Sequence, residues 1–188
     1  DKASEELNRF NDYVIQNNYI DLPVVGIEPS CLLTFNDEYQ TLKNVKNREQ
    51  IKNKFYLLEE FILEQIRNNN NIKANKFDQN VLIHGHCHQK SQDRMKGLTN
   101  LLSELNINNK MIESSCCGMA GSFGYDSKTY EVSKKMANLS LIPAINNSGE
   151  KDFIVANGTS CRHQISDLSE KKGKHVSELL FKIFETVN

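Results

Sequence analysis

The sequence NVLIHGHCHQK, residues 80–90, changes character at its middle. It begins as a short β-branched apolar run and then leads, past a glycine and Cys87, into an amphipathic helical pattern. An apolar run of this length that ends at a turn residue and gives way to a helical period is typical of a strand–loop–helix unit. Cys87 therefore lies where a predicted strand gives way to a predicted helix.

The same unit recurs along the chain. Further short apolar runs occupy 22–30, 109–115 and 152–160, and each is followed by a cysteine. Helices with apolar residues on one face are predicted at 4–19, 46–67, 90–105, 126–146 (ending near Pro143) and 175–187. Short strands that alternate with amphipathic helices predict an α/β fold with a short, mainly parallel sheet flanked by helices.

One long polar connection, RNNNNIKANKFDQN at 67–80, interrupts this pattern. It predicts a boundary between two related lobes, 1–70 and 80–188. The sequence starts at Asp1 rather than at a methionine. We therefore expect it to be a piece of a larger protein with neighbouring segments missing.

Charge and hydropathy exclude several classes of function. The chain carries 23 basic and 24 acidic residues, so no basic excess indicates nucleic-acid binding and no polybasic stretch indicates a membrane surface. No apolar run approaches the length that spans a bilayer, and no signal peptide opens the sequence. These features predict a cytoplasmic protein.

The five cysteines are odd in number and lack a secretory context, which argues against a disulfide framework. Each follows a predicted strand, and the carboxyl ends of parallel strands meet at one edge of a sheet. Thiolates there favour zinc, copper(I) or an iron–sulfur cluster, which needs about four sulfur ligands. The candidate metal ligands are Cys87, Cys116, Cys117 and Cys161, with Cys31 as a fifth. The alternative is five free buried thiols that act as small hydrophobic residues.

Three glycines follow the double cysteine in ESSCCGMAGSFGYD, residues 113–126. Gly118, Gly121 and Gly124 would let the backbone pass close to a bulky cofactor and adopt unusual dihedral angles. Backbone N–H groups at the start of the following helix would donate hydrogen bonds to it. A flexible loop without a ligand is the alternative explanation.

The histidines are clustered as well. Alternate residues of an extended segment point to opposite sides, so His84, His86 and His88 are predicted to share one side and Cys87 the other. One or two histidines would bind a metal or a substrate carboxylate, and the others would donate hydrogen bonds to the ligands. A density of cysteine and histidine this high also permits a tetrahedral zinc site.

Three polar residues near the C-terminal end complete the candidates. His163 lies two residues after a cysteine and joins His86 and His88 as an alternative metal ligand. Arg162 would neutralise the charge of a cluster, or else it is a surface residue at the start of a helix. His175 stands apart from the other histidines and is expected to be a solvated residue at the start of a helix.

The motifs EPSC, HGHCHQK, CCGMAGSFGY and NGTSCRHQI, in this order between Val24 and Asp167, resemble the cysteine-rich CCG domain. The similarity is to the version at the C-terminus of FAD-linked oxidases fused to iron–sulfur modules, of the D-lactate or D-2-hydroxyglutarate dehydrogenase type. It extends to the iron–sulfur subunit of glycolate oxidase and, more distantly, to one subunit of heterodisulfide reductase.

The resemblance implies two repeats, of which the second is present in full. Cys31 resembles the late cysteine of the first repeat, which implies that the piece is C-terminal. The fullest family pattern ends in CxxC, whereas Cys161 is followed by Arg162, His163 and Gln164. A five-thiolate noncubane cluster would therefore lack one ligand, which Cys31 would replace if the repeats face each other. A 4Fe-4S cubane cluster, or a site with an open position, is equally allowed.

The function implied by the resemblance is electron transfer within a flavin-dependent 2-hydroxy acid oxidoreductase. Electrons would pass from FAD, in a part of the protein outside this chain, towards a quinone or another acceptor. Flavoprotein and ferredoxin-like domains would be the partners and would hold the protein at the inner face of the membrane. The fragment alone is expected to be inactive, with no catalytic residue of its own. Two alternatives stay open: a structural zinc-binding docking module, and a thiol/disulfide redox module like heterodisulfide reductase.

Overall fold

The computed structural model describes residues 2–52, 54–69 and 71–184. Its strands form two parallel sheets. The smaller sheet pairs β1 (Val24–Gly26) with β2 (Phe55–Leu57). The larger has the order β4–β3–β5 and contains β3 (Val81–His84), β4 (Asn109–Met111) and β5 (Phe153–Ala156). The predicted α/β fold with short parallel sheets flanked by helices is confirmed.

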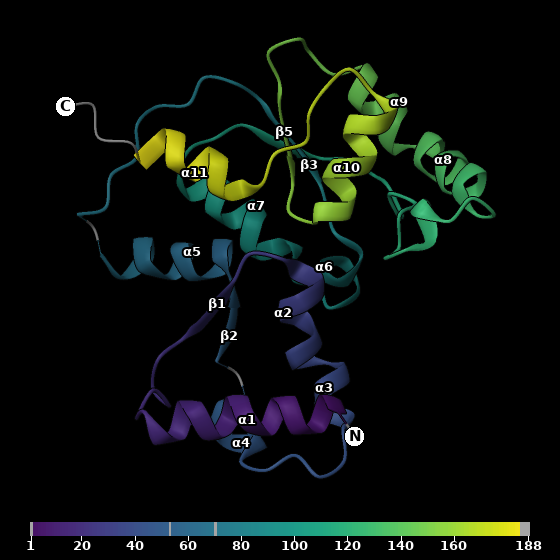
Figure 1. Cartoon of the computed structure of the whole chain (residues 1–188). Coiled ribbons are helices and arrows are strands. Elements are labelled where there is room, and N and C mark those ends of the chain that lie inside the picture. Colours follow the sequence, from purple (N-terminus) through teal and green to yellow (C-terminus); the bar gives the residue numbers. More distant parts are fainter. Residues whose placement is uncertain (1, 53, 70, 185–188) are drawn as a thin grey trace.

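Helices cover both faces of the larger sheet (Figure 1). One face packs against α5 (Leu58–Asn68), α7 (Met95–Glu104) and α11 (Val176–Phe184). The other packs against α8 (Tyr130–Leu139), α9 (Leu141–Asn146) and α10 (Thr159–Leu168). Successive strand residues point to opposite faces, so Val155 is buried in the first core and Ile154 in the second. The strands are therefore apolar on both sides, as buried parallel strands are.

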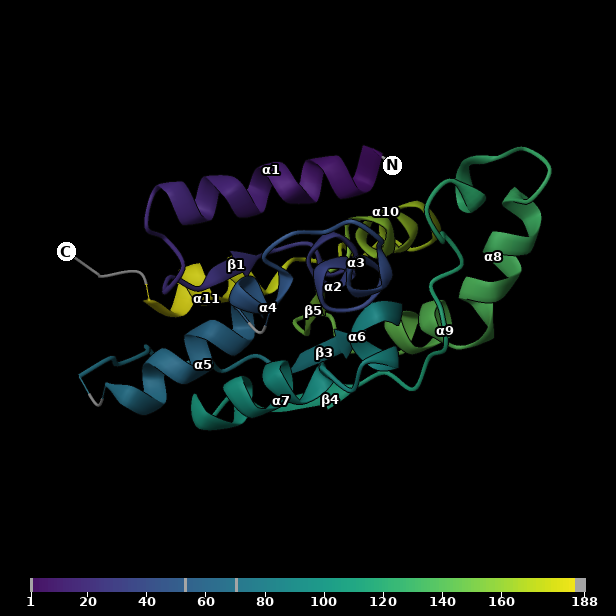
Figure 2. The same ribbon diagram turned by 90° about the horizontal axis from the view of Figure 1, so that it is seen from below.

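The smaller sheet has a separate core. It packs against α1 (Lys2–Gln16), α2 (Pro29–Asn36), α3 (Glu38–Thr41) and α4 (Arg48–Ile51). Leu33, Phe55 and Leu57 are the most deeply buried side chains there. Both views show α1 beside the smaller sheet and away from the larger one (Figures 1 and 2). In contrast, α2 lies beside α6 (Cys87–Ser91), which brings the smaller lobe next to the cysteine-bearing loops.

The single helix predicted at 46–67 is wrong, because β2 interrupts it. Phe55 and Leu57 are buried while Tyr56 between them is not, which is the alternation of a strand. Aromatic side chains favour a pleated, half-buried surface, and pairing with β1 decides the conformation. The apolar period that continues beyond this point belongs to α5 alone.

The prediction for 126–146 also needs a correction. Two helices, α8 and α9, replace one, and they meet at Ser140, whose φ of −152° is not helical. Pro143 does not end the helix, because it is the third residue of α9. A proline in the first turn gives up no helical hydrogen bond, since the N–H groups there have no partner within the helix.

The remaining elements agree more closely. Strands lie within all four predicted runs, and a helix covers most of 4–19. The helix at 90–105 is divided into α6 and α7 around Asp93, which has a positive φ of 52°. The predicted tail helix begins at Val176, and its residues 185–187 lie outside the described part of the chain. Among the described residues, no helix has the length and apolar character needed to cross a membrane.

The division into lobes at 1–70 and 80–188 stays a prediction, but the packing crosses it. Helix α5 precedes the polar connection in sequence, yet it packs against α7 in the core of the larger sheet. Leu63 of α5 is buried there. The smaller lobe therefore contributes one helix to the layer that covers the larger sheet (Figure 1).

Candidate metal centre

Every cysteine lies just beyond the carboxyl end of a strand. Cys87 is the first residue of α6, three positions after the last residue of β3, and Cys161 is the third residue of α10, after β5. Cys116 and Cys117 lie in the loop that follows β4. Because β3, β4 and β5 are parallel neighbours, these three loops leave the sheet at the same edge. The structure thus joins four sulfur atoms that are up to 74 residues apart in sequence, from Cys87 to Cys161.

Side-chain hydrogen bonds connect the four sulfur atoms in a row. Cys87 contacts Cys116, Cys116 contacts Cys117, and Cys117 contacts Cys161. The hydrogen bonds from Cys117 and Cys87 hold the pKa of Cys116 far below its usual range. The hydrogen bond from Cys117 lowers the pKa of Cys161 to about 5. The pKa values of Cys87 and Cys117 are raised by the same contacts.

His84 joins the inner end of this row. A ring nitrogen of His84 and the Sγ atoms of Cys117 and Cys161 all lie within 4.8 Å of one another, and all three residues are buried. The Nδ1 atom of His84 lies 2.8 Å from the hydroxyl of Ser114. Its Nε2 atom is buried and has no hydrogen bond of good geometry among the described residues, although a contact of the His84 side chain with Cys161 helps to lower the pKa of that thiol. A buried imidazole nitrogen beside two sulfur atoms fits a metal ligand.

The predicted alternation of the histidines and Cys87 is wrong. It required the strand conformation to continue through the motif, but α6 begins at Cys87, so the period of two ends with the strand. As a result His84 and Cys87 reach the same cluster. A histidine as the last residue of a buried strand, three positions before a cysteine, was the available signal for His84.

His86 and His88 lie at the start of α6. His86 caps this helix, and its Nδ1 accepts the N–H of His88 at 3.2 Å. Burial lowers the pKa of His86, which therefore favours the neutral imidazole. The rings of His86 and His88 meet edge to face at 5.5 Å. Their predicted role as alternative ligands stays a prediction.

Three other predicted residues lie further out. His163 is exposed, and its Nδ1 is 2.7 Å from the hydroxyl of Tyr125. Cys31 is exposed in the first turn of α2 and is not part of the sulfur row. Arg162 donates hydrogen bonds to the carbonyl oxygens of Ala156 (2.9 Å) and Asn157, so it orders the loop between β5 and α10.

Gly118 is required by the packing of the double-cysteine loop. Its φ is +90°, and a Cβ atom there would lie 2.3 Å from the carbonyl oxygen of Ser133. Its N–H donates to Cys116 Sγ at 3.2 Å. Gln164 donates to the carbonyl oxygen of Cys117 (2.9 Å) and to the hydroxyl of Ser133 (3.0 Å). Helix α10 thus fixes the loop from inside.

Gly121 and Gly124 differ from each other in what surrounds them. Gly124 is buried, and a Cβ atom there would lie 2.3 Å from Met119 Sδ. Gly121 has a φ of +64° and open space around it. The predicted contacts of all three glycines with a cofactor stay predictions.

Lys90 was not among the predicted site residues. Its Nζ donates to the carbonyl oxygen of Ser114 (2.6 Å) and to that of Ser115. These two carbonyls immediately precede Cys116. Lys90 thus places a positive charge beside the sulfur row and ties α6 to the loop after β4.

Two carboxylates from the smaller lobe hold the cysteine-bearing segments. Glu28 accepts hydrogen bonds from the N–H (2.9 Å) and hydroxyl (2.8 Å) of Thr159, the first residue of α10. Glu59, which is 1% exposed, accepts from Gln89 Nε2 (2.7 Å) and Asn157 Nδ2 (2.9 Å). Burial raises the pKa of Glu59 to about 7. Neither residue was recognised from the sequence, because a lone glutamate carries no pattern.

The expectation that His175 is solvated is wrong. It is buried, and its Nε2 lies 2.7 Å from the carbonyl oxygen of Ile27, the residue before Glu28. Burial lowers the pKa of its imidazole. His175 therefore links the start of α11 to the smaller lobe instead of facing water.

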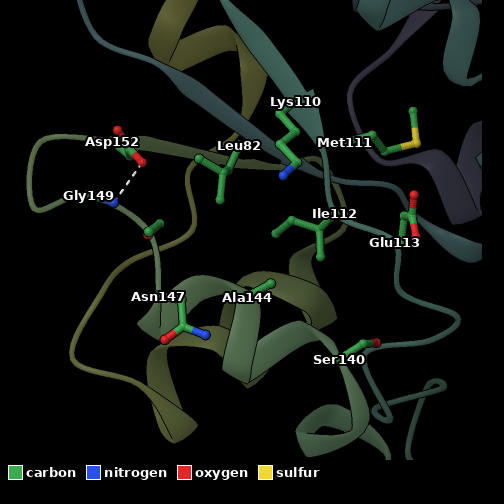
Figure 3. Close-up of a pocket in the computed structure, with 11 residues that line it drawn as sticks. Leu82, Lys110, Met111, Ile112, Glu113, Ser140, Ala144, Asn147, Gly149 and Asp152 are labelled. Atoms are coloured by element: carbon green, nitrogen blue, oxygen red, sulfur yellow. Dashed lines mark hydrogen bonds between the residues drawn. The ribbon is translucent and has the colours of Figure 1, made fainter.

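A cavity of about 560 Å³ lies beside β4 (Figure 3). Leu82 and Ile112 give it an apolar side, and Lys110, Glu113 and Asp152 add charged groups. On one wall, a backbone N–H donates to the Asp152 carboxylate at 2.8 Å. No cysteine lines this cavity, so it is separate from the residues that the sequence predicts as metal ligands, and the cysteine cluster is retained as the candidate site.

Comparison with known proteins agrees with this geometry. Residues 81–166 match the cysteine-rich domain family called CCG. The chain is 22% identical over 161 residues to D-2-hydroxyglutarate dehydrogenase of Pseudomonas putida KT2440, and the match covers 85% of this chain and 15% of that protein. It is 23% identical over 160 residues to one subunit of the anaerobic glycerol-3-phosphate dehydrogenase of Escherichia coli K12, and this match covers 85% and 40% respectively.

The D-2-hydroxyglutarate dehydrogenase of Escherichia coli K12 is similarly related, at 23% identity over 95% of this chain and 18% of its own length. The chain thus spans less than half the length of these curated relatives. No solved structure gives a significant match. The matched segment contains the whole sulfur row and His84. Residues 81–166 therefore resemble the cysteine-rich CCG domain, and the proteins to which the chain is similar are dehydrogenases.

Proposed function

We propose that this chain is the iron–sulfur module of a dehydrogenase, with the cluster bound by Cys87, Cys116, Cys117 and Cys161. The observation that carries the proposal is the row of four sulfur atoms, delivered by three loops to one edge of the sheet. Four thiolates are what a cubane iron–sulfur cluster requires, and such a centre supplies one-electron transfer. The buried, unpartnered nitrogen of His84 supports a metal-binding use of this site.

The surrounding groups favour thiolates. Gly118 donates its N–H to Cys116 Sγ, and hydrogen bonds to anionic sulfur tune a centre of this kind. Cys161 lies in the first turn of α10, where the positive end of the helix dipole stabilises negative charge. Lys90 adds a cation beside the double-cysteine loop. Each of these features places a hydrogen-bond donor or positive charge near the sulfur atoms that would bind the cluster.

For the whole protein we propose a flavin-dependent oxidoreductase that acts on a 2-hydroxy acid or a related substrate. The centre would lie between FAD and a quinone or other acceptor, and the partners would be flavoprotein and ferredoxin-like domains of the same protein or complex. The support is that the curated relatives are named as D-2-hydroxyglutarate dehydrogenase and as part of an anaerobic glycerol-3-phosphate dehydrogenase. This chain spans only 15% to 40% of those proteins.

A structural zinc site is the second candidate. One observation favours it: His84, Cys117 and Cys161 already present their ligand atoms within 4.8 Å of one another. Zinc takes mixed cysteine and histidine ligands in tetrahedral structural sites, and a third sulfur, from Cys116, would supply the fourth ligand. Under this alternative the site would stabilise the domain without taking part in electron transfer.

The test is the metal content of protein purified and reconstituted without oxygen. Iron and acid-labile sulfide at about four each per chain are expected for a cubane cluster. Cys116→Ser and Cys117→Ser should each lose most of the iron, whereas Cys31→Ser, at an exposed cysteine outside the sulfur row, is the matched control and should keep it. One zinc per chain with no stable iron uptake would support the zinc site instead. Full iron content in both double-cysteine variants would overturn the ligand assignment.

A further inference from the structure

The strand β3 ends in a histidine that the sequence pattern did not single out as a ligand. His84 is 1% exposed, so its imidazole is removed from water. A buried imidazole nitrogen without a partner loses a hydrogen bond that it would make in solvent. Among the described residues the Nε2 atom of His84 has no hydrogen bond of good geometry, and the His84 side chain contacts Cys161 from the central strand of the larger sheet.

The hydroxyl of Ser114 sets which ring nitrogen is available. It lies 2.8 Å from Nδ1, and Ser114 is two residues before Cys116 in the loop after β4. A metal-bound histidine usually donates its other N–H to an oxygen, which fixes the tautomer and the ring orientation. When the hydroxyl of Ser114 accepts from Nδ1–H, the lone pair is on Nε2.

The distances suit a single ion. Metal–nitrogen and metal–sulfur bonds of about 2.0–2.3 Å in a tetrahedral site place ligand atoms roughly 3.3–3.8 Å apart. The ligand atoms of His84, Cys117 and Cys161 are within 4.8 Å of one another, so small side-chain movements would bring them to that spacing. All three are buried, whereas Cys87 and Cys116 at the other end of the row are half-buried.

We propose that His84 Nε2 is a direct metal ligand, so that the centre has a mixed sulfur and nitrogen ligand set. Ser114 acts as the positioning residue that orients the ring. The ion is either an iron of the cluster or zinc, both of which accept thiolate and imidazole. This inference rests on the proposed metal-binding function and specifies the inner end of the row. In a zinc site, His84, Cys117 and Cys161 share one ion. In a cubane cluster each iron takes a single protein ligand, so His84 binds one iron in place of a cysteine.

The first experiment uses the full chain reconstituted with iron and sulfide without oxygen, then reduced. Pulsed electron paramagnetic resonance should show a strong nitrogen coupling, which should change when only the histidines are labelled with ¹⁵N. The coupling should disappear in His84→Ala and persist in His163→Ala, the matched control at an exposed histidine. A histidine-dependent coupling that survives in His84→Ala, or the lack of any such coupling in the wild type, would overturn the proposal.

A zinc-loaded sample provides the second arm. X-ray absorption at the zinc edge should fit three sulfur atoms and one nitrogen in the wild type, and an all-sulfur shell would overturn the proposal. His84→Cys supplies a sulfur in place of the nitrogen. It should therefore bind more metal than His84→Ala does, but it should show no nitrogen signal. This variant guards against a trivial loss of folding in His84→Ala. Ser114→Ala should keep the metal but release it several-fold faster to a chelator, and an unchanged release rate would remove its positioning role.

The two proposals fail in different ways. Metal binding with no histidine-derived signal would overturn the ligand role of His84 and leave the proposed function intact. Binding of neither iron nor zinc by the wild-type chain would overturn both proposals. A nitrogen signal from zinc together with no iron uptake would confirm His84 while moving the function to the structural zinc site.

Discussion

Glu59 makes the stability of this domain depend on pH in an unusual direction. Its side chain is buried in the first turn of α5, and burial, with a smaller contribution from the charge of Glu60, raises its pKa from 4.5 to about 7. The amides of Gln89 and Asn157 oppose this rise only in part. The folded protein therefore keeps a proton on Glu59 at pH values where the unfolded chain has lost it.

The size of the effect follows from the two pKa values. Below pH 4.5 both states are protonated, and Glu59 contributes nothing to the pH dependence. Between pH 4.5 and about 7 the unfolded state ionises first, so the free energy of unfolding falls by roughly 3 kcal/mol and stays reduced at higher pH. Glu59→Gln removes this loss, because an amide does not ionise.

Urea denaturation of wild type and Glu59→Gln across pH 4.5 to 8 measures the prediction. A pH-independent effect of the amide on stability is the same at every pH and therefore does not affect the trend. The free energy of unfolding of the variant minus that of wild type should rise by roughly 3 kcal/mol between pH 4.5 and pH 8. Glu64→Gln, at an exposed position on the same helix, is the control and should run parallel to wild type. Parallel curves for wild type and Glu59→Gln would refute the claim that the buried carboxyl group retains its proton.

Three further changes test the packing and the site. Gly118→Ala should lower the free energy of unfolding, measured by urea denaturation, by at least about 2 kcal/mol, because the added Cβ would meet the Ser133 carbonyl. Gly121→Ala, where the surroundings are open, should lower it by only about 1 kcal/mol. Equal losses in the two variants would contradict the close contact at Gly118. Leu101→Ala should lower the free energy of unfolding by about 2–5 kcal/mol, since the side chain is fully buried, and a loss below about 1 kcal/mol would argue against this core. Lys90→Met keeps a side chain of similar length but removes its charge, so metal should transfer faster to a chelator, and an unchanged transfer rate would speak against the carbonyl contacts.

The strand–loop–helix units were predictable from the sequence because their apolar runs are short and end at turn residues. The positions of β3 and β5 followed directly, and with them the gathering of the sulfur atoms at one edge. In contrast, β2 was hidden, because Phe55 and Leu57 also fit the helical period of the segment that follows. Pairing with β1, which is about 30 residues away, decides its conformation, and a local pattern does not contain this information.

The histidines show the same limit within the site. Alternation along a strand grouped His84 with His86 and His88, and the start of α6 at Cys87 separated them. The sequence could show that histidines were dense, but the end of β3 decides which of them faces the sulfur atoms. Buried polar contacts such as those of Glu59 and His175 join segments about 30 to 150 residues apart, so neither residue type nor spacing reveals them.

The contacts of Glu28 and Glu59 bear on how the protein can be divided. The family match begins at residue 81, after both glutamates. A fragment cut to residues 81–166 would keep every sulfur of the row but leave the first turn of α10 without its carboxylate cap. It would also uncover the face of the sheet beneath α5 and α11. The matched segment is therefore smaller than the folding unit, and the minimal piece to express for metal binding includes the helices on both sides of the match.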